Sequence, residues 1–192
     1  MKNFFMSCEK LTSINLSNFK TPKLQKLGGM FEGCFSRVSF NISSFDTSNV
    51  DNFASLFYSC LNLEYINLTY FKTSNGVTLK WMFSKYIKLT SLDLSNFDLS
   101  KAQIISSMFE DCYNLEYIDF NFADKWSPIT ELNNIFSGCF RLKSLDFSSL
   151  NISLVTNMDL MFYNCQNLQY INMPNFDTTF ITSMNLTFAG CK

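Results

Sequence analysis

The chain has 192 residues, of which 47% are hydrophobic and 16% are charged, and its formal net charge is −1. Ordinary domains carry about 25% charged residues, so this chain is unusually rich in core-forming residues, and its 15 basic and 16 acidic residues are spread along it without the clusters that nucleic acid or anionic lipid requires. It contains no histidine, which excludes Ser-His-Asp and Cys-His catalysis and every zinc site that uses histidine.

A Phe-x-x-Cys element recurs from one end of the chain to the other. The successive steps between its cysteine positions are 26, 26, 26, 26, 27, 26 and 26 residues, with Tyr86 in the fourth of them. A fixed period of this length predicts stacked supersecondary units, that is, a solenoid. The sequence therefore predicts a single solenoid domain over residues 1–192. Its coils start near residues 4, 30, 56, 82, 108, 135 and 161, and a partial coil occupies 187–192.

Each coil shows two patterns in turn, which residues 46–71 illustrate. Apolar residues from Val50 to Cys60 recur at spacings of three and one, the pattern of one face of a short helix, and Thr47 and Ser48 could cap it. Alternating apolar residues over 63–68 then predict a short strand, and Phe71 turns the corner. The predicted fold is an α/β, right-handed, leucine-rich-repeat-like solenoid of about seven coils, each a short parallel strand plus a short helix.

Three coils depart from the pattern. Arg37 replaces the leucine expected three residues after Cys34, so the strand of that coil should begin irregularly. Tyr86 is much larger than the cysteine it replaces, so its coil must open locally or turn the hydroxyl outward. The fifth coil has an extra residue within 121–128, which predicts a bulged turn that carries Trp126.

The repeat resembles a known family. The motif of Met108–Phe120 and the turn of residues 175–178 are similar to the repeats of BspA-like leucine-rich-repeat surface proteins, and the likeness extends over essentially all 192 residues. The resemblance implies a leucine-rich-repeat fold, a place at the cell surface or outside the cell, and an adhesin-type role in binding. Residues 1–10 show no signal-peptide apolar region, and no apolar run approaches the roughly 18 residues of a membrane span, so we expect no membrane insertion.

Two columns of strand residues should point away from the core, because side chains alternate along a strand. The first column alternates Ser and Tyr and includes Tyr65, Tyr117 and Tyr170; the second contains only Asn and Asp. Tyrosine is a favoured interface residue, so we expect a partner to bind this face. The alternative is that these residues only cover the sheet and hydrogen-bond along it. The candidate partner-binding residues are Tyr65, Tyr117, Tyr170, Asp93, Asp119, Asp146 and Trp126.

Asp93, Asp119 and Asp146 form the only close acidic run on this face. Stacked carboxylates could bind Ca²⁺ or raise one another's pKa, but no second set of ligands is evident and a solvated acidic stripe is the simpler interpretation. A flat sheet also lacks the cleft that a pair of catalytic carboxylates needs. We therefore expect no metal, no cofactor and no enzymatic activity. The seven cysteines should be buried, reduced and structural, because they lie in the apolar stripe.

Two functions follow from these patterns. The first is a non-enzymatic recognition module that binds a protein or glycan through its sheet face. The second is a structural or assembly subunit that packs laterally or end to end, because neither end of the chain shows the polar capping segment that solenoids need for solubility. An open tyrosine and aspartate face would favour recognition, whereas an apolar outer wall would favour assembly.

Overall fold

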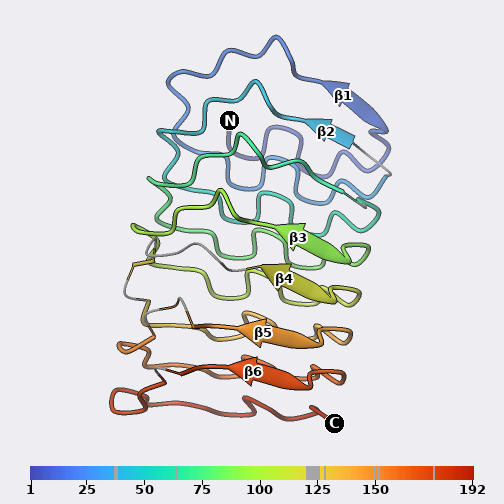
Figure 1. Ribbon diagram of the computed structural model, residues 1–192. Helices are drawn as coiled ribbons and strands as arrows, with labels where there is room; N and C mark the ends of the chain where they lie inside the picture. Colours follow the sequence, from blue (N-terminus) through green and yellow to red (C-terminus); the bar gives the residue numbers. More distant parts are fainter. Residues whose placement is uncertain are drawn as a thin grey trace.

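The computed structural model shows the chain as coils stacked along one axis, with short strands in one column (Figure 1). It describes residues 1–192 except 37–38, 64, 120–125, 128, 149, 151 and 175, and only the backbone of Ser39 and Phe40. The irregular start predicted at Arg37 and most of the predicted bulge at 121–128 lie outside the described residues. The strands are β1 (Ser13–Asn15), β2 (Ser39–Asn41), β3 (Ser91–Asp93), β4 (Tyr117–Asp119), β5 (Ser144–Asp146) and β6 (Tyr170–Asn172).

Neighbouring strands are parallel and paired with the register that the repeat predicts. Each residue of β1, β3 and β5 is opposite the residue of the same column in β2, β4 and β6, as in the pair Leu92 and Ile118. The predicted columns are therefore rows in the folded chain. The ladders are two-stranded in the described part of the chain, whereas the repeat predicted one continuous sheet.

The predicted helices are wrong: the described residues contain no α-helix. In the segment before Cys60, the N–H groups of Phe53, Ser55 and Phe57 donate to carbonyls of the next coil, 25 residues further on, at 2.8–3.0 Å. The N–H groups of the residues between them close tight turns, as Leu56 does to Phe53 at 3.2 Å. An α-helix directs every N–H along its own axis, so it has none to share with a neighbouring coil. No helix in this part of the chain is long and apolar enough to cross a membrane.

The turns require left-handed backbone at two fixed positions of every coil. The residues five and one before the cysteine column have φ between 54° and 81°, as at Ser55 and Ser59. A positive φ at the third residue of a turn is what a type II turn demands, and glycine adopts it without cost. Gly33 and Gly138 serve this need, whereas a bulky residue such as Trp81 carries a strain of about 1–2 kcal/mol. The hydrogen bonds to the next coil oppose that strain.

One column of phenylalanine rings runs through the core. Successive rings are stacked nearly parallel with centroids 5.4–6.0 Å apart. The stack consists of Phe5, Phe31, Phe57, Phe83, Phe109, Phe136, Phe162 and Phe188. Burying each ring contributes about 1.5–3 kcal/mol, so the coils depend on their neighbours for stability.

The cysteine column is interior, as predicted. Five of the seven cysteines are buried, and Cys8 and Cys191 are partly buried. From Cys34 onward each thiol donates to the carbonyl oxygen of the phenylalanine 29 or 30 residues earlier, at 3.1–3.4 Å. Burial raises the pKa of the Cys34 thiol to about 11 and that of Cys112 to about 12, which keeps both protonated as donors.

Tyr86 takes the cysteine place of its coil and is fully buried. Its hydroxyl is enclosed and has no hydrogen-bond partner among the described residues, so the predicted outward rotation of this hydroxyl is wrong. Burial is also what raises the pKa of this phenol far above its ordinary value. A polar atom enclosed without a partner opposes folding, so this coil contains a local energetic cost that the other coils lack.

The column of Asn and Asp residues ends each strand with the same local hydrogen bond. The side-chain oxygen accepts the N–H of the residue two places on, as Asn67 does from Thr69 at 3.0 Å and Asp93 from Ser95 at 2.8 Å. Such a bond fixes the turn that follows the strand. The simpler interpretation of this column, hydrogen bonding within the sheet, is therefore part of its role.

We predict that truncating one ring of the phenylalanine stack destabilises the whole chain. Phe109→Ala removes a fully buried ring between Phe83 and Phe136 and should lower the free energy of unfolding by about 3–5 kcal/mol. The matched control is Tyr170→Ser, because Tyr170 is largely exposed and Ser occupies its column in other coils. Urea unfolding followed by circular dichroism checks this; equal destabilisation by the two changes would contradict the assignment of core and face.

We also predict that the strand-ending aspartates make stability depend on acid pH. Hydrogen bonds from Ser95 and Ser148 lower the pKa of Asp93 and Asp146 in the folded chain. Their contribution is therefore present above the unfolded pKa of about 3.9 and disappears as the pH falls through the lower folded values.

Asparagine fills the same column elsewhere and makes the same bond, so the double variant Asp93→Asn, Asp146→Asn should fold equally well. The excess stability of the unaltered chain over this variant should be largest at neutral pH and vanish below about pH 3. The reverse change, Asn67→Asp, should add a pH dependence. Thermal melts between pH 2 and 7 measure both, and a difference that is constant with pH would disprove the assignment.

Candidate functional site

The strand column that alternates Ser and Tyr is open to solvent. Tyr65, Tyr117 and Tyr170 have exposed fractions of 74%, 53% and 61%, and the residues between them in the strands are buried or half-buried. We call the exposed surface of these strands and of residues 65–69 the sheet face. None of the three rings is in the core, so packing of the chain does not account for their presence.

Tyr117 is held by charged neighbours from the next coil. Lys143 Nζ lies 5.0 Å from the centroid of the Tyr117 ring and 3.4 Å from its hydroxyl. The same ammonium donates to Glu116 at 2.5 Å, which raises the pKa of Lys143 and lowers that of Glu116. Arg141 adds a longer contact to Glu116 at 3.9 Å. The Tyr117 ring is therefore oriented by a cation, and it has less free surface than Tyr65.

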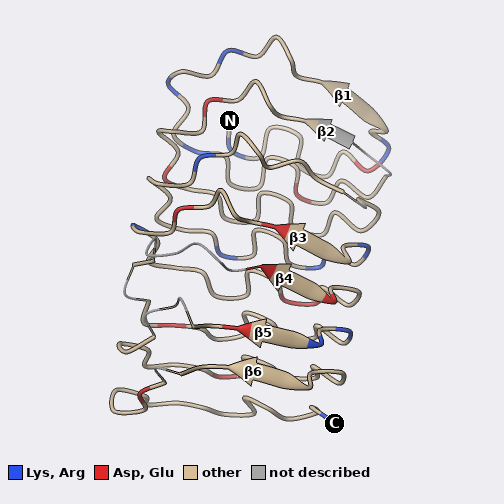
Figure 2. Ribbon diagram, in the orientation of Figure 1, with Lys and Arg blue, Asp and Glu red and all other residues tan. Residues whose placement is uncertain are grey.

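The acidic run lies at the ends of three successive strands, where Figure 2 shows red at the tips of β3, β4 and β5. Asp93 and Asp119 are opposite one another in the register, and Asp146 accepts from Ser148 N–H at 2.7 Å and from Asn172 at 3.1 Å. The suggestion that these carboxylates raise one another's pKa is wrong for Asp93 and Asp146, because the hydrogen bonds lower both. The described residues contain no group of three side chains arranged to hold a metal ion.

Trp126 lies in a different setting from the three tyrosines. It pairs with Leu99 as an isolated parallel bridge, and the next residue, Ser127, donates to the Leu99 carbonyl at 2.9 Å. Its ring is half-buried and packs against the core. The structure therefore gives Trp126 a packing role on the wall beside Leu99, and only part of its ring is available to a partner.

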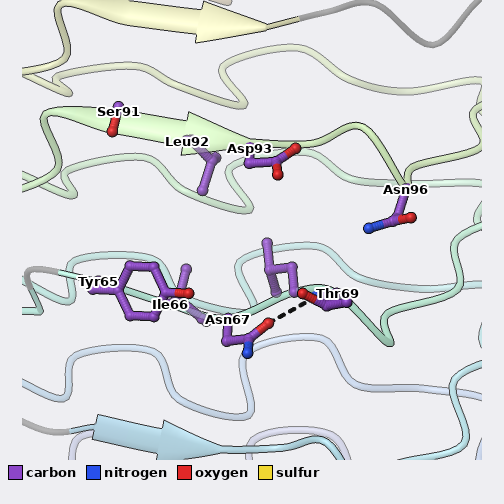
Figure 3. Close-up of a pocket in the computed structure, with 9 residues that line it drawn as sticks. Tyr65, Ile66, Asn67, Thr69, Ser91, Leu92, Asp93 and Asn96 are labelled. Carbon is purple, nitrogen blue, oxygen red and sulfur yellow. Dashed lines mark hydrogen bonds between the residues drawn. The ribbon is translucent and has the colours of Figure 1, made fainter.

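The sheet face is interrupted at the third coil. Residues 65–69 form no strand, and no hydrogen bond of the described chain joins them to β2 or to β3. An open-sided hollow of about 140 Å³ lies between these residues and β3. Figure 3 shows Tyr65, Asn67 and Thr69 from one coil and Ser91, Asp93 and Asn96 from the next around this hollow. The buried side chains Ile66, Leu68 and Leu92 also line it.

The repeat could not reveal this hollow, because Tyr65 and its neighbours match the strand pattern as well as any coil does. Ser91 and Asp93 were recognised as face residues, but Thr69 and Asn96 were not singled out. The one sequence signal is that Thr69 and Tyr70 follow Leu68 where other coils have Ser-Asn or Ser-Ser, and this signal alone does not identify a site.

Further hollows lie among the turn segments of the first four coils. One of about 380 Å³ is bordered by Gly29, Glu32 and Trp81, and Lys80 Nζ lies 4.0 Å above the Trp81 ring. Another, of about 600 Å³, is bordered by Lys23, Asp51 and Lys101. Sequence reasoning missed Trp81 because it falls in a segment that was predicted to be helical.

Comparison with known proteins gives one family and one solved structure. No curated protein matches the chain. The solved structure is that of a leucine-rich repeat protein from Bacteroides ovatus, with 21% identity and a TM-score of 0.38. The match covers 85% of this chain and 41% of the other, so the chain spans less than half the length of that protein.

The family match covers residues 35–127 and 130–192, which is most of the chain. Both segments contain the 26-residue repeat, the stacked phenylalanines and the sheet face described above. The chain belongs to the family described as Mycoplasma protein of unknown function, DUF285.

Proposed function

We propose that this chain is a non-enzymatic recognition module that binds a protein or glycan through its sheet face. The observation that carries the proposal is the column of Tyr65, Tyr117 and Tyr170, three large rings that stay exposed on a regular surface. Tyrosine buries a large area at a low entropy cost and keeps a hydroxyl for hydrogen bonding, so such rings are typical of binding surfaces.

The regular stacking supports this function because it gives the face a fixed shape. We infer that the coils form a right-handed, leucine-rich-repeat-like solenoid of the BspA-like type, which the motif of Met108–Phe120 resembles. Members of that family act mostly at the cell surface, and we propose the same location, outside or on the cell, for this chain. Lys and Arg are spread over several coils in Figure 2, so the proposal includes neither nucleic acid nor insertion into a membrane.

The test is a triple variant in which Tyr65, Tyr117 and Tyr170 become Ser, the residue that their column already carries in other coils. The labelled chain and the variant are applied to a printed glycan array and to a panel of immobilised extracellular proteins. We expect the variant to lose at least about tenfold in affinity for each feature that the unaltered chain binds, because each ring is an anchor.

The melting temperatures of the two proteins should differ little, since the rings lie outside the core. The matched control is Tyr113→Ser, which removes an exposed ring away from the sheet face and should leave binding unchanged. Unchanged binding by the triple variant would disprove the proposal and move the site to another surface.

A second candidate, an assembly subunit, is favoured by apolar side chains exposed on the last coil. These side chains are Phe180, Met184, Leu186 and Phe188. In the inner coils the next coil covers the equivalent positions and completes the backbone ladder. We propose that a second copy of the chain can cover them end to end.

Static light scattering over a concentration series tests this assembly. The apparent mass should rise with concentration, and the double variant Leu186→Asn, Phe188→Ser should weaken the rise because it removes apolar contact from the exposed coil. A mass that stays at one chain throughout the series would rule the assembly out for this chain.

A further inference from the structure

The hollow beside Tyr65 differs from the rest of the sheet face because several of its polar groups have hydrogen-bonding capacity left over. Asn67 uses its side-chain oxygen for Thr69 N–H, which leaves the amide N–H₂ as a donor. Asp93 accepts from Ser95 N–H and keeps further acceptor capacity on its carboxylate. The hydroxyls of Ser91 and Thr69 make no hydrogen bond within the described chain.

The backbone adds to this capacity. The N–H groups of residues 65–68 make no hydrogen bond in the described chain, because this coil pairs with neither neighbouring strand. The Asn96 side chain, from the turn after β3, faces the same hollow, and Figure 3 shows it level with the opening between the two coils. Donors and acceptors thus surround an apolar floor of Ile66, Leu68 and Leu92, with the exposed Tyr65 ring at one side.

We propose that this hollow binds one neutral sugar ring of a glycan, with a face of the sugar packed against Tyr65. This inference rests on the proposed function and names the ligand class of one part of the same face. A pyranose ring presents C–H bonds on its faces, which pack well on the electron-rich face of an aromatic ring, and hydroxyls at its edge. Each hydroxyl both donates and accepts, which suits the mixture of amides, hydroxyls and carboxylate around the hollow.

The size and charge of the hollow favour this ligand over others. Its volume of about 140 Å³ is well below the roughly 300–1,000 Å³ of sites for drug-sized molecules, so it accepts a single ring. No Lys or Arg borders it and Asp93 does, so phosphate and other anions would be repelled. An apolar protein side chain would leave the polar rim without partners, which opposes binding.

The other two tyrosines do not share this arrangement. The Tyr117 ring is already faced by Lys143, which donates to Glu116 as well. Tyr170 belongs to β6, which is paired with β5, so its strand has no opening on that side. Tyr65 alone of the three candidate tyrosines combines a free ring with an unpaired backbone and a hollow.

The experiment titrates the chain with four neutral probes: the methyl glycosides of glucose, galactose, mannose and N-acetylglucosamine. Saturation-transfer NMR reports contact with the sugar protons, and shifts of the side-chain amides of Asn67 and Asn96 report the place of binding. We expect saturable binding of at least one probe, and glucuronate should bind more weakly than the glucose probe because Asp93 repels its carboxylate.

The variant Tyr65→Ser should weaken binding of that probe about tenfold, whereas the matched control Tyr170→Ser should leave it unchanged. The variant Asn96→Ala removes one hydrogen-bonding partner without touching the ring and should also weaken binding. All three side chains are exposed, and melting temperatures verify that each variant is folded.

Absence of saturable binding for all four probes, or equal affinity of the unaltered chain and the Tyr65→Ser variant, would overturn the sugar site. Binding to the protein panel that the triple tyrosine variant abolishes would, in that case, leave the proposed recognition function intact. Loss of the sugar site and loss of the wider function are therefore separate results.

Discussion

The structure depends on the backbone hydrogen bonds that join each coil to the next. In the turn segments, every second N–H donates to a carbonyl 25 residues further along, as Phe57 does to Met82 at 3.0 Å. This offset is one short of the 26-residue repeat, so each coil presents equivalent groups to the next one and the ladder can continue. The ladder sets the distance between coils, and that distance stacks the phenylalanine rings at 5.4–6.0 Å and aligns the thiols with carbonyls. The left-handed residues are tolerated because each frees an N–H for this ladder at the point where a regular helix would consume it.

This constraint explains what the sequence could and could not predict. The columns, the parallel register and the burial of the cysteines follow from the period, because a residue that recurs every 26 positions must stack on itself. The helix prediction was wrong because apolar spacings of three and one are equally compatible with consecutive tight turns whose N–H groups alternate between local and neighbouring partners. A signal was available: Gly29, Gly33, Gly138 and Gly190 fall at the two left-handed positions, and Asn or Asp fills them in several other coils. These residue types tolerate positive φ, whereas a helical segment would not select them at fixed positions.

The site was predictable in its columns and not in its detail. Tyr65, Tyr117 and Tyr170 share one strand position, and the alternation of strand side chains places them on the outside. What distinguishes them is the pairing of their coils, and that depends on small differences in how neighbouring coils pack. Trp126 shows the opposite error: an aromatic residue on an irregular turn suggested a binding surface, yet a large apolar ring beside a core opening gains more by packing against it.

A regular ladder also makes its own interruptions informative. Where coils are paired, the strand backbone is satisfied and a ligand can contact only side chains. At residues 65–69 the pairing is absent, so backbone and side-chain groups are both available beside the most exposed tyrosine of the face. The missing pairing has a cost in stability, and the phenylalanine stack on either side, with Phe57 and Phe83 at 5.9 Å, holds the two coils together without it. A repeat architecture can therefore open its surface at one coil while its core stays continuous, which separates the residues that maintain the fold from those free to bind.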